Sequence, residues 1–410
     1  MTFMNSHIAV IGGGPSGLMA AEVLATSGYS ITVYEHKPSL GRKFLMAGRG
    51  GLNLTHSEDI DKFITRYGLA SDRLAPVIAA FPPAALRAWC EGLGQDVFVG
   101  TSGRIFPKAF KASPLLRAWL ARLESLGVNF ALGQRWQGWD ENDNLIFTDA
   151  DDVRMTVKPM ATVLALGGAS WPRLGSDGSW VGILAAQGIS ISSLRPTNCG
   201  FAVAWSDIFR MRYIGQPLKS VVINFAGIKV PGEIMMTEKG VEGGPVYALS
   251  VALRDTIAKQ GNAVLHLDLR PNLTLDNYIQ KLRVPRGALS FTNYLRKAGG
   301  LSPVAIGLLM ERSDRKDLSN LPPEKLAALI KNLPIQLTAP FALDRAISTA
   351  GGIVFDDLDK NFMIKSKPGV FAIGEMLDWE APTGGYLLQA CFATAVAAAV
   401  GIKLFLKVKE

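Results

Sequence analysis

Cysteine is scarce in this chain. Its 410 residues include three cysteines, Cys90, Cys199 and Cys391, which lie far apart and form no CxxC pair. This spacing excludes a redox-active disulfide of the thioredoxin-reductase type, and it fits a reducing compartment. The first residues, MTFMNSH, lack the charged segment and the long apolar run of a secretory signal. We therefore expect a cytoplasmic protein.

Histidines and long hydrophobic runs are also few. The four histidines do not combine with cysteines or carboxylates at metal-ligand spacing, so we expect no metal site and no Ser-His-Asp triad. Leu387 to Leu406 is long enough to span a membrane, but it contains Gln389 and Lys403 among mostly Ala, Val and Gly. We expect a buried C-terminal helix there and no membrane. The remaining composition is that of a globular protein, and the length allows two or three domains.

The opening stretch from His7 to Glu35 has the pattern of a dinucleotide-binding fold. A β-branched strand, Ile8 to Ile11, runs into the sequence GGGPSG, which is followed by a helix over 15–27 and a second strand over 30–34. Gly12 and Gly14 allow a tight turn against a pyrophosphate, and Gly17 lets the helix lie close to the strand. The helix N-terminus would direct free N–H groups at the phosphates.

Glu35 completes this pattern about twenty residues after the glycines. Its carboxylate can accept hydrogen bonds from both ribose hydroxyls of an adenosine. The same negative charge would repel a 2′-phosphate. We therefore predict a bound dinucleotide without a 2′-phosphate at this position.

Further glycine-rich segments recur along the chain. Residues 41–56, GRKFLMAGRGGLNLTH, are expected to form a loop along an anionic ligand, with Arg42, Lys43 and Arg49 facing it. The strand over 161–166 is followed by Gly167 and Gly168, where an open α/β sheet binds ligand. The helix over 111–126 is expected to be capped by Ser113 and followed by another strand of the parallel sheet, 128–132.

From about Arg195 the sequence changes to short segments in which apolar and polar residues alternate, a pattern that indicates a β-rich substrate domain. Residues 269–331 then read as helical. They hold eleven Lys and Arg against five Asp and Glu, a surplus of six in a chain of net charge +8. This surplus is typical of a solvated helical surface, or of a footprint for nucleic acid.

Segments with the sequence pattern of β-strands occur again near the C-terminus. The segments over 345–355 and 369–373 are expected to be the last strands of the first domain. They are followed by GEMLD, from Gly374 to Asp378, and by TGGY, from Thr383 to Tyr386, before the helix over 387–403. Asp378 can accept a hydrogen bond from a ribityl hydroxyl. The positive end of the helix would stabilise a reduced flavin lying over Gly384 and Gly385.

Taken together, these motifs resemble the BaiN/RdsA family of NAD(P)/FAD-dependent oxidoreductases, which includes aminoacetone-oxidase-like proteins. The resemblance covers nearly the whole chain. Its blocks are residues 41–56, 165–170, 195–338 and 349–389. Two blocks depart from the family pattern: Gly51 and Leu52 stand where the family has Arg-Cys beside the flavin, with Arg49 two places earlier, and residues 240–245 replace a GxSGP loop. Both departures fall where substrate is expected, so the substrate does not carry over.

The resemblance implies an α/β fold of the two-dinucleotide-fold flavoprotein type. A Rossmann-like FAD-binding domain would carry an inserted β-barrel-like domain and a helical subdomain. The implied domains are the FAD-binding domain at 1–193 and 342–410, the β-rich substrate domain at 194–268, the basic helical subdomain at 269–331, and a return strand of the insert at 332–341.

The resemblance also implies the cofactor contacts and the reaction class. The expected FAD contacts are Gly12, Gly14, Pro15, Ser16, Gly17, Glu35, Arg42, Lys43, Gly48, Asn53, Ala165, Gly167, Gly374, Asp378, Gly384, Gly385 and Tyr386. NAD(P)H would dock transiently, reduce the flavin, and lead to hydride transfer from N5 to an unsaturated small molecule. Tyr386, His56 and Tyr247 are the candidate proton donors.

Three alternatives remain open at this point. The chain could be an amine oxidase that uses oxygen, a flavin-dependent RNA (uridine) reductase that binds RNA through residues 269–331, or a flavin-binding regulatory protein without turnover. The sequence does not define the oligomeric state.

Overall fold

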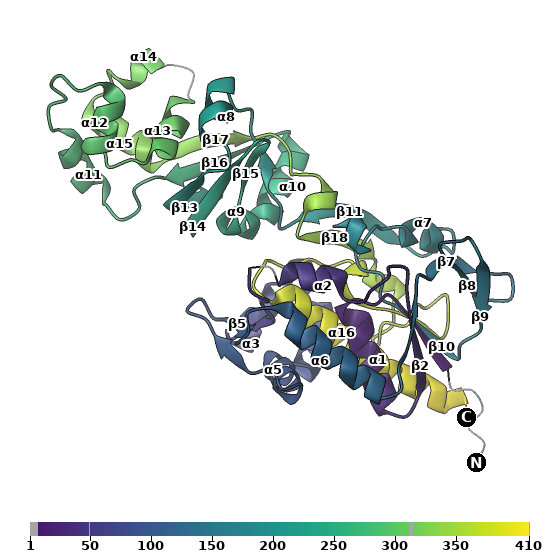
Figure 1. Ribbon diagram of the computed structural model, residues 1–410. Coiled ribbons are helices and arrows are strands. Elements are labelled where there is room, and N and C mark those ends of the chain that lie inside the picture. Colours follow the sequence, from purple (N-terminus) through teal and green to yellow (C-terminus); the bar gives the residue numbers. More distant parts are fainter. Residues whose placement is uncertain (1–6, 49, 312–314, 410) are drawn as a thin grey trace. The chain divides into compact units, whose positions relative to one another are not determined.

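The computed structural model describes residues 7–48, 50–311 and 315–409. These residues form two compact units (Figure 1). Unit 1 comprises Met1–Pro196 and Leu343–Glu410, and unit 2 comprises Thr197–Ala342. The opening residues, in which we expect no signal segment, and Arg49 lie outside the described part of the chain. The finer division into five segments stays a prediction.

Unit 1 is built on a five-stranded parallel sheet in the order β19-β10-β1-β2-β6. Strands β1 and β10 are almost wholly buried apolar runs, as expected of a parallel sheet that is covered on both faces. The bounds of these strands are β1 His7–Ile11, β2 Ser30–Glu35, β6 Asn129–Leu132, β10 Ala161–Leu164 and β19 Val370–Ala372. The predicted Rossmann-like sheet is therefore confirmed, and its outer strand β19 comes from the far end of the sequence.

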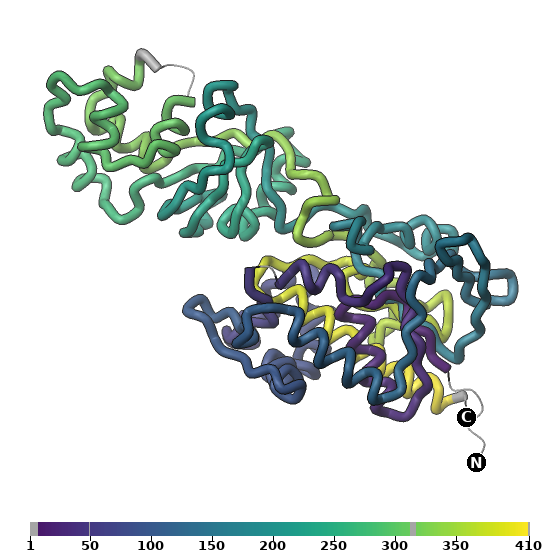
Figure 2. Tube along the Cα trace, in the orientation of Figure 1, coloured from purple at the N-terminus to yellow at the C-terminus, as the bar shows by residue number. Residues whose placement is uncertain are grey.

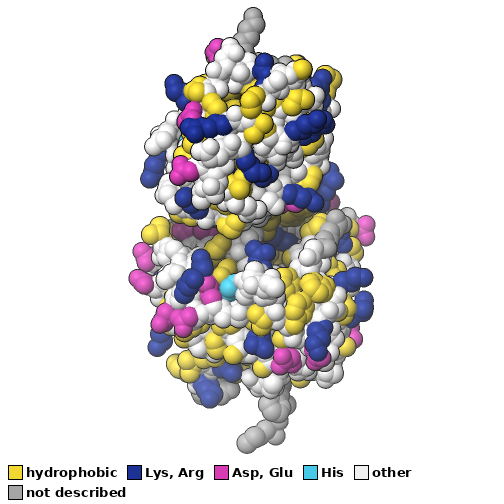
Figure 3. Space-filling model, turned by 90° about the vertical axis from the view of Figure 1, so that its left-hand side faces the viewer, with side chains coloured by type: hydrophobic (Ala, Val, Ile, Leu, Met, Phe, Trp, Pro, Cys, Tyr) yellow, Lys and Arg dark blue, Asp and Glu magenta, His cyan; other side chains and the backbone are white. Residues whose placement is uncertain are grey.

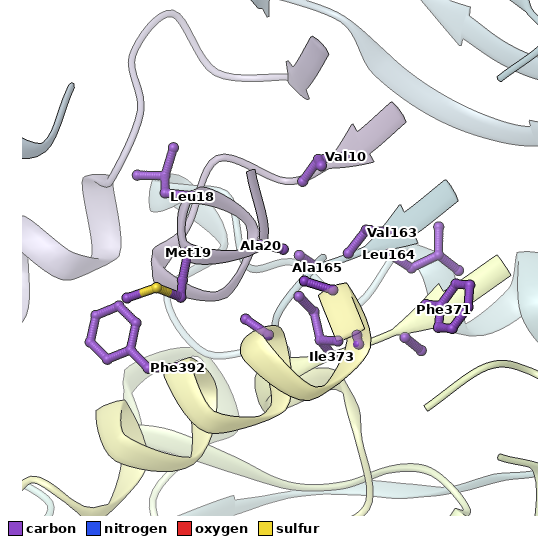
Figure 4. Packing of buried hydrophobic residues seen from close by; sticks show 14 of the residues in the cluster. Val10, Leu18, Met19, Ala20, Val163, Leu164, Ala165, Phe371, Ile373 and Phe392 are labelled. Atoms are coloured by element: carbon purple, nitrogen blue, oxygen red, sulfur yellow. The ribbon is translucent and has the colours of Figure 1, made fainter. Parts of the chain in front are cut away.

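Two helices from opposite ends of the chain pack together beside this sheet. Helix α1 (Pro15–Thr26) and helix α16 (Tyr386–Lys409) lie side by side, as the purple and yellow segments of Figure 2 show. Met19 of α1 points toward Phe392 of α16 in Figure 4, and both side chains are buried. A thioether against an aromatic ring is a favourable core contact. The apolar C-terminal run is thus a core helix of unit 1, as its sequence predicts.

Helix α16 is also long and apolar enough to cross a membrane, by length and composition, over Tyr386–Val408. Half of its most apolar window is buried inside the structure, and Ala390, Ala395, Ala398 and Ile402 are fully buried. Burial against the core of unit 1 accounts for the apolar character of the buried face of the helix.

Smaller elements complete unit 1. The remaining helices are α2 Arg42–Ala47, α3 Ile60–Thr65, α4 Ser71–Ala80, α5 Pro83–Gly92, α6 Ala112–Ser125 and α7 Trp180–Ala185. The remaining strands form the antiparallel sheets β3-β5-β4 and β7-β8-β9 and the pair β11-β18, with bounds β3 Thr55–His56, β4 Val97–Val99, β5 Arg104–Pro107, β7 Arg135–Trp139, β8 Leu145–Thr148, β9 Arg154–Val157, β11 Ile191–Thr197 and β18 Ser348–Ile353.

Two local predictions for unit 1 were wrong. Residues 41–56 are not one loop, because α2 forms within them and Leu52 and Leu54 are fully buried. Ser113 does not cap α6, since the helix begins one residue earlier and Lys111 takes the capping position. In both cases, tertiary packing outweighed a local sequence signal. The segment expected over 345–355 is a strand of unit 1, as predicted: β18 pairs there with β11.

Unit 2 is built on a six-stranded antiparallel sheet that closes on itself. Its order is β12-β15-β14-β13-β16-β17, with bounds β12 Phe201–Ala202, β13 Pro217–Phe225, β14 Ile228–Thr237, β15 Gly240–Glu242, β16 Ala263–Asp268 and β17 Leu333–Leu337. The residues just after β17 return to β12: Thr338 N donates to Ala202 O at 3.0 Å, and Ala202 N donates to Ala339 O at 2.8 Å. These bonds join the two edge strands, which confirms the predicted barrel-like domain.

Helices of unit 2 cover this barrel, and the later ones make up most of the basic segment, residues 269–331. Their bounds are α8 Asp207–Tyr213, α9 Gly244–Ala248, α10 Ser250–Gln260, α11 Leu275–Leu282, α12 Phe291–Lys297, α13 Pro303–Met310, α14 Arg315–Leu318 and α15 Pro323–Lys331. Thr274, Ser290 and Ser302 cap α11, α12 and α13 by accepting backbone N–H groups. The residues expected to form a helical subdomain are therefore helical.

A buried carboxylate gives a test of the unit 1 core. Glu22 lies on α1 and is 8% exposed, and its carboxylate accepts hydrogen bonds from Trp89 Nε1 at 3.0 Å, Trp119 Nε1 at 2.6 Å and Arg122 Nη1 at 2.9 Å. We expect Glu22→Ala to lower the free energy of unfolding by about 3 kcal/mol, because buried donors lose their acceptor. Urea unfolding measures this. Glu124→Ala on the exposed face of α6 is the control, and an equal loss in both variants would contradict the prediction.

Candidate functional site

The glycine turn after β1 is held by close backbone contacts. A Cβ on Gly12 would lie 2.3 Å from Ala165 O, and Gly12 has φ +110°. A Cβ on Gly17 would lie 2.0 Å from Gly12 O. Only glycine fits at these two positions. Gly14 differs, because a Cβ there would meet nothing within 4 Å, so this residue faces open space.

The N-terminus of α1 opens onto the same space. Gly14 caps this helix without a side-chain hydrogen bond, and Pro15 occupies its first turn. Its first N–H groups are therefore available, and the helix dipole favours an anion there. Backbone N–H groups at such an end form the usual phosphate site of dinucleotide folds.

Glu35 lies at the end of β2 beside the turn. Its Oε2 accepts from Gly13 N at 2.9 Å, its Oε1 accepts from Lys37 N at 2.8 Å, and His36 Nδ1 lies 3.2 Å from Oε1. Burial alone would raise the pKa of Glu35, but the hydrogen bonds from His36, Lys37 and Gly13 outweigh it and lower that pKa. The carboxylate is therefore ionised at neutral pH and can accept from hydroxyl groups.

Lys43 connects two loops around this turn. Its Nζ donates to Ser170 Oγ at 2.6 Å and to Glu375 Oε2 at 2.7 Å. Glu375 Oε1 accepts in turn from Thr349 N at 3.0 Å. Sequence reasoning missed Glu375, although it stands between the selected residues Gly374 and Asp378. That block contains two acids, and its sequence did not indicate which of them would reach the glycine turn.

Several of these groups line one cleft. Its walls include nine of the predicted FAD contacts, namely Gly12, Gly14, Pro15, Ser16, Glu35, Arg42, Lys43, Ala165 and Gly167. Three buried polar atoms on its walls have no hydrogen-bond partner among the described residues: His36 Nε2, Arg42 Nε and Ser176 Oγ. Buried polar groups normally have a hydrogen-bond partner, so a polar ligand in the cleft would supply the partners of these three atoms. Cationic, hydroxyl and imidazole donors suit the phosphates and riboses of FAD.

The other predicted contacts are not among the residues that line this cleft. Gly374 packs against Ser16, since a Cβ on Gly374 would lie 2.2 Å from Ser16 Oγ. The closing acid-glycine block therefore reaches the opening glycine turn. Asp378 Oδ2 accepts from Ser192 Oγ at 2.5 Å. Gly48 packs on Ala112, and Gly17 lies under the turn.

Asn53 has an unusual setting. Its neighbours Leu52 and Leu54 donate their N–H groups to Phe110 O and Ile105 O, each at 2.9 Å, and both leucine side chains are fully buried. Asn53 Oδ1 is buried without a hydrogen-bond partner in the described part of the chain. A buried amide oxygen of this kind is a second point at which a ligand donor would be accommodated.

Two of the three candidate proton donors come together in unit 1. The rings of His56 and Tyr386 stack at 5.6 Å with an interplanar angle of 18°. Tyr386 donates its hydroxyl to Glu58 Oε1 at 2.5 Å, and burial followed by this carboxylate raises the pKa of Tyr386. Tyr247 lies in unit 2, where burial and Glu242 raise its pKa to about 12. The catalytic roles of all three remain predictions.

The cleft also holds a thiol. Cys391 of α16 lines it, and burial, together with Glu375, raises the pKa of this thiol to about 12. The group is therefore protonated at neutral pH and is a poor nucleophile. Among residues that the structure describes, no group of three or more His, Cys, Asp and Glu is placed to hold a metal ion.

Comparison with known proteins places the chain in a family. Residues 6–401 match the family described as HI0933-like protein Rossmann domain. The chain belongs to this family. Its relatives include a 3-dehydro-bile acid delta(4,6)-reductase of Clostridium scindens, which is 25% identical over 95% of this chain and 97% of its own length. A ribosomal RNA dihydrouridine synthase of Haemophilus influenzae is 23% identical over 97% of this chain and 98% of its own length.

Solved structures share the fold. A 3-ketosteroid delta1-dehydrogenase of Sterolibacterium denitrificans has a TM-score of 0.55 at 14% identity, and the match covers 98% of this chain and 100% of that one. A flavocytochrome c3 fumarate reductase has a TM-score of 0.52 at 15% identity, over 99% of this chain and 78% of that one. The predicted BaiN/RdsA-type membership and the predicted class, an FAD-dependent oxidoreductase, are therefore confirmed.

Gly14 offers a direct test of the cleft. We expect Gly14→Ala to weaken FAD binding at least tenfold, about 1.4 kcal/mol, because its methyl group would enter the space beside the α1 N-terminus. The melting temperature of the FAD-free protein should stay unchanged, since nothing lies within 4 Å of the added carbon. Gly182→Ala in α7 adds a methyl group to equally open space and is the matched control. Fluorescence titration with FAD gives the affinities, and unaltered binding by Gly14→Ala would refute the assignment.

Proposed function

We propose that this protein is a reductase that takes electrons from NADPH or NADH and uses them to saturate an electron-poor C=C bond of a small molecule. The observation that carries the proposal is the cleft of unit 1, in which an uncapped helix end, an ionised Glu35 and three unpartnered polar atoms face one space. FAD bound there would supply hydride transfer from N5 of its reduced ring.

The residues of the cleft would divide the binding of FAD among themselves. Glu35 would accept from the adenosine ribose, and the α1 N-terminus would lie against the pyrophosphate. Arg42 has an unpartnered Nε for an anionic oxygen. Lys43 is held by Ser170 and Glu375, so its charge is fixed in place, and the network ties three loops around the cofactor.

The direction of the reaction is inferred from a relative. The Clostridium scindens protein, similar over nearly the full length of both chains, is named as a reductase. The sequence contains one full glycine fingerprint for a dinucleotide, so the nicotinamide donor would dock only transiently. This assignment differs from an amine oxidase, in which the substrate reduces the flavin and oxygen reoxidises it.

Anaerobic stopped-flow absorption separates these possibilities. We expect NADPH or NADH to bleach the visible absorption band of the bound oxidised flavin, and an enone to restore it without oxygen. Bleaching by an amine but by neither nicotinamide would favour the oxidase. A bound flavin that no donor reduces would leave the protein as a regulatory flavoprotein.

RNA is the second candidate substrate, and two observations favour it. The Haemophilus influenzae relative is named as a ribosomal RNA dihydrouridine synthase. The helical segment of unit 2 carries exposed cationic side chains, among them Lys281, Arg286, Arg296 and Lys297. Figure 3 shows Lys and Arg side chains spread over the face of the molecule that it draws. Arg312 and Asp314 of this segment lie outside the described residues.

Salt dependence tests the RNA reading. If Arg296 and Lys297 contact phosphates, changing both to Gln should weaken RNA binding and reduce the slope of log K against log salt by about 1.4, since each single-strand phosphate contact contributes about 0.7. The matched control changes two exposed cations of unit 1, Arg117→Gln with Lys360→Gln. Binding to ribosomal RNA fragments that hardly varies with salt would remove RNA as a substrate.

A further inference from the structure

Three residues of one short segment contact the start of α16. Thr55 and His56 form β3, and Glu58 follows two residues after His56; these three residues are called the 55–58 clamp below. Thr55 contributes its backbone, because a Cβ on Gly385 would lie 2.4 Å from Thr55 Cα. It also contributes its hydroxyl, which donates to Gln389 Oε1 at 2.8 Å. One residue thus holds both the turn before the helix and its first turn.

His56 and Glu58 hold Tyr386 from two sides. The His56 ring stacks on the phenol ring, and the Glu58 carboxylate accepts its hydroxyl. His56 is itself fixed: its Nε2 lies 2.9 Å from Ser102 O, and its Nδ1 accepts from Glu58 N at 3.1 Å. Both ring nitrogens are therefore engaged, and the hydrogen bond to a carbonyl places the proton on Nε2.

Glu58 is fixed by a cation. Arg66 donates to both carboxylate oxygens, Nε to Oε1 at 3.0 Å and Nη2 to Oε2 at 2.7 Å, in a bidentate pair. Burial acts to raise the pKa of Glu58, but the bonds from Arg66 and Tyr386 lower it overall. The side chain is 9% exposed, and Lys62 Nζ adds a second cation 3.9 Å away. The carboxylate therefore stays ionised and oriented.

Tyr386 transmits this constraint to the glycines before α16. Its ring folds back over Gly384, where a Cβ would lie 2.6 Å from Tyr386 Cε2. Gly384 has φ +140° and Gly385 has φ +95°, conformations that other residues rarely adopt. The two glycines are enclosed by the Tyr386 ring on one side and the Thr55 backbone on the other, so their path depends on both.

We propose that Glu58, acting through Tyr386, is a positioning residue that sets the direction of the α16 N-terminus and thereby the reduction potential of bound FAD. This inference rests on the proposed function and on the prediction from the sequence that the flavin ring lies over Gly384 and Gly385. A helix N-terminus stabilises negative charge only within its first turn, so a small displacement changes the stabilisation of an anionic reduced flavin. On this account the Tyr386 proton is committed to Glu58, and Tyr386 orients the helix.

Two conservative variants test the inference. Tyr386→Phe removes one hydroxyl and keeps the ring on Gly384 and His56, whereas Glu58→Gln keeps an oxygen acceptor and removes the charge opposite Arg66. We expect each to shift the preference of the bound flavin for its reduced form about tenfold, which for a two-electron couple is a fall of about 30 mV in midpoint potential. The double variant should resemble either single variant, because both changes weaken the same interaction between Tyr386 and Glu58. Tyr29→Phe and Glu124→Gln, outside the clamp, should cause no shift.

A second readout does not need the cofactor. In the FAD-free protein, backbone amides at 386–389 should exchange several-fold faster with solvent in both clamp variants than in the wild type, while the melting transition stays cooperative. Unchanged potentials and unchanged exchange in folded variants would overturn the positioning role and leave the proposed function intact. A wild-type protein that binds no FAD would instead overturn the proposed function, a result that the exchange measurement does not depend on.

Discussion

The contact on which the rest of unit 1 depends is the close approach of two segments that are 358 residues apart in sequence, Ser16 and Gly374. It requires glycine at position 374, because a Cβ there would lie 2.2 Å from Ser16 Oγ. The same convergence is visible in the core, where α1 packs on α16 and β19 joins the edge of the parallel sheet beside β10. The cleft therefore forms only where the last segment of the chain packs against the glycine turn of the first segment.

Around this contact the charges are arranged for an anionic ligand. Lys43 is held between Ser170 and Glu375, and Glu35 is held by backbone N–H groups and His36. Each charged group therefore has a partner that fixes its orientation, which is the arrangement expected of a preorganised site. The unpartnered atoms on the same walls are His36 Nε2, Arg42 Nε and Ser176 Oγ.

Much of this arrangement could be predicted from the sequence, and the reasons are specific. The β1 strand, the glycine turn, α1 and Glu35 follow a local pattern in which each element fixes its neighbour, so their positions were predicted to within a residue or two. For unit 2 the short alternating strands predicted a β-rich domain, and the family resemblance implied that this domain is barrel-like. The family resemblance extended these predictions to the far end of the chain.

Other features could not be predicted, because they depend on contacts between distant segments. Glu58 carries no motif, and its role follows only from the approach of Tyr386 more than three hundred residues later. Likewise, Ser113 has the sequence of a helix cap, yet packing of the preceding residues starts α6 earlier. Burial of Ala112 against Gly48 is the competing contact.

The closure of the unit 2 barrel has a consequence for how such a chain can change in evolution. Its first and last segments lie next to each other, as the bond from Phe341 N to Gly200 O at 2.8 Å records. A module whose entrance and exit adjoin can be enlarged, trimmed or exchanged while the host fold keeps the same pair of attachment points. Diversification of substrate within such a lineage would then require no redesign of the nucleotide fold.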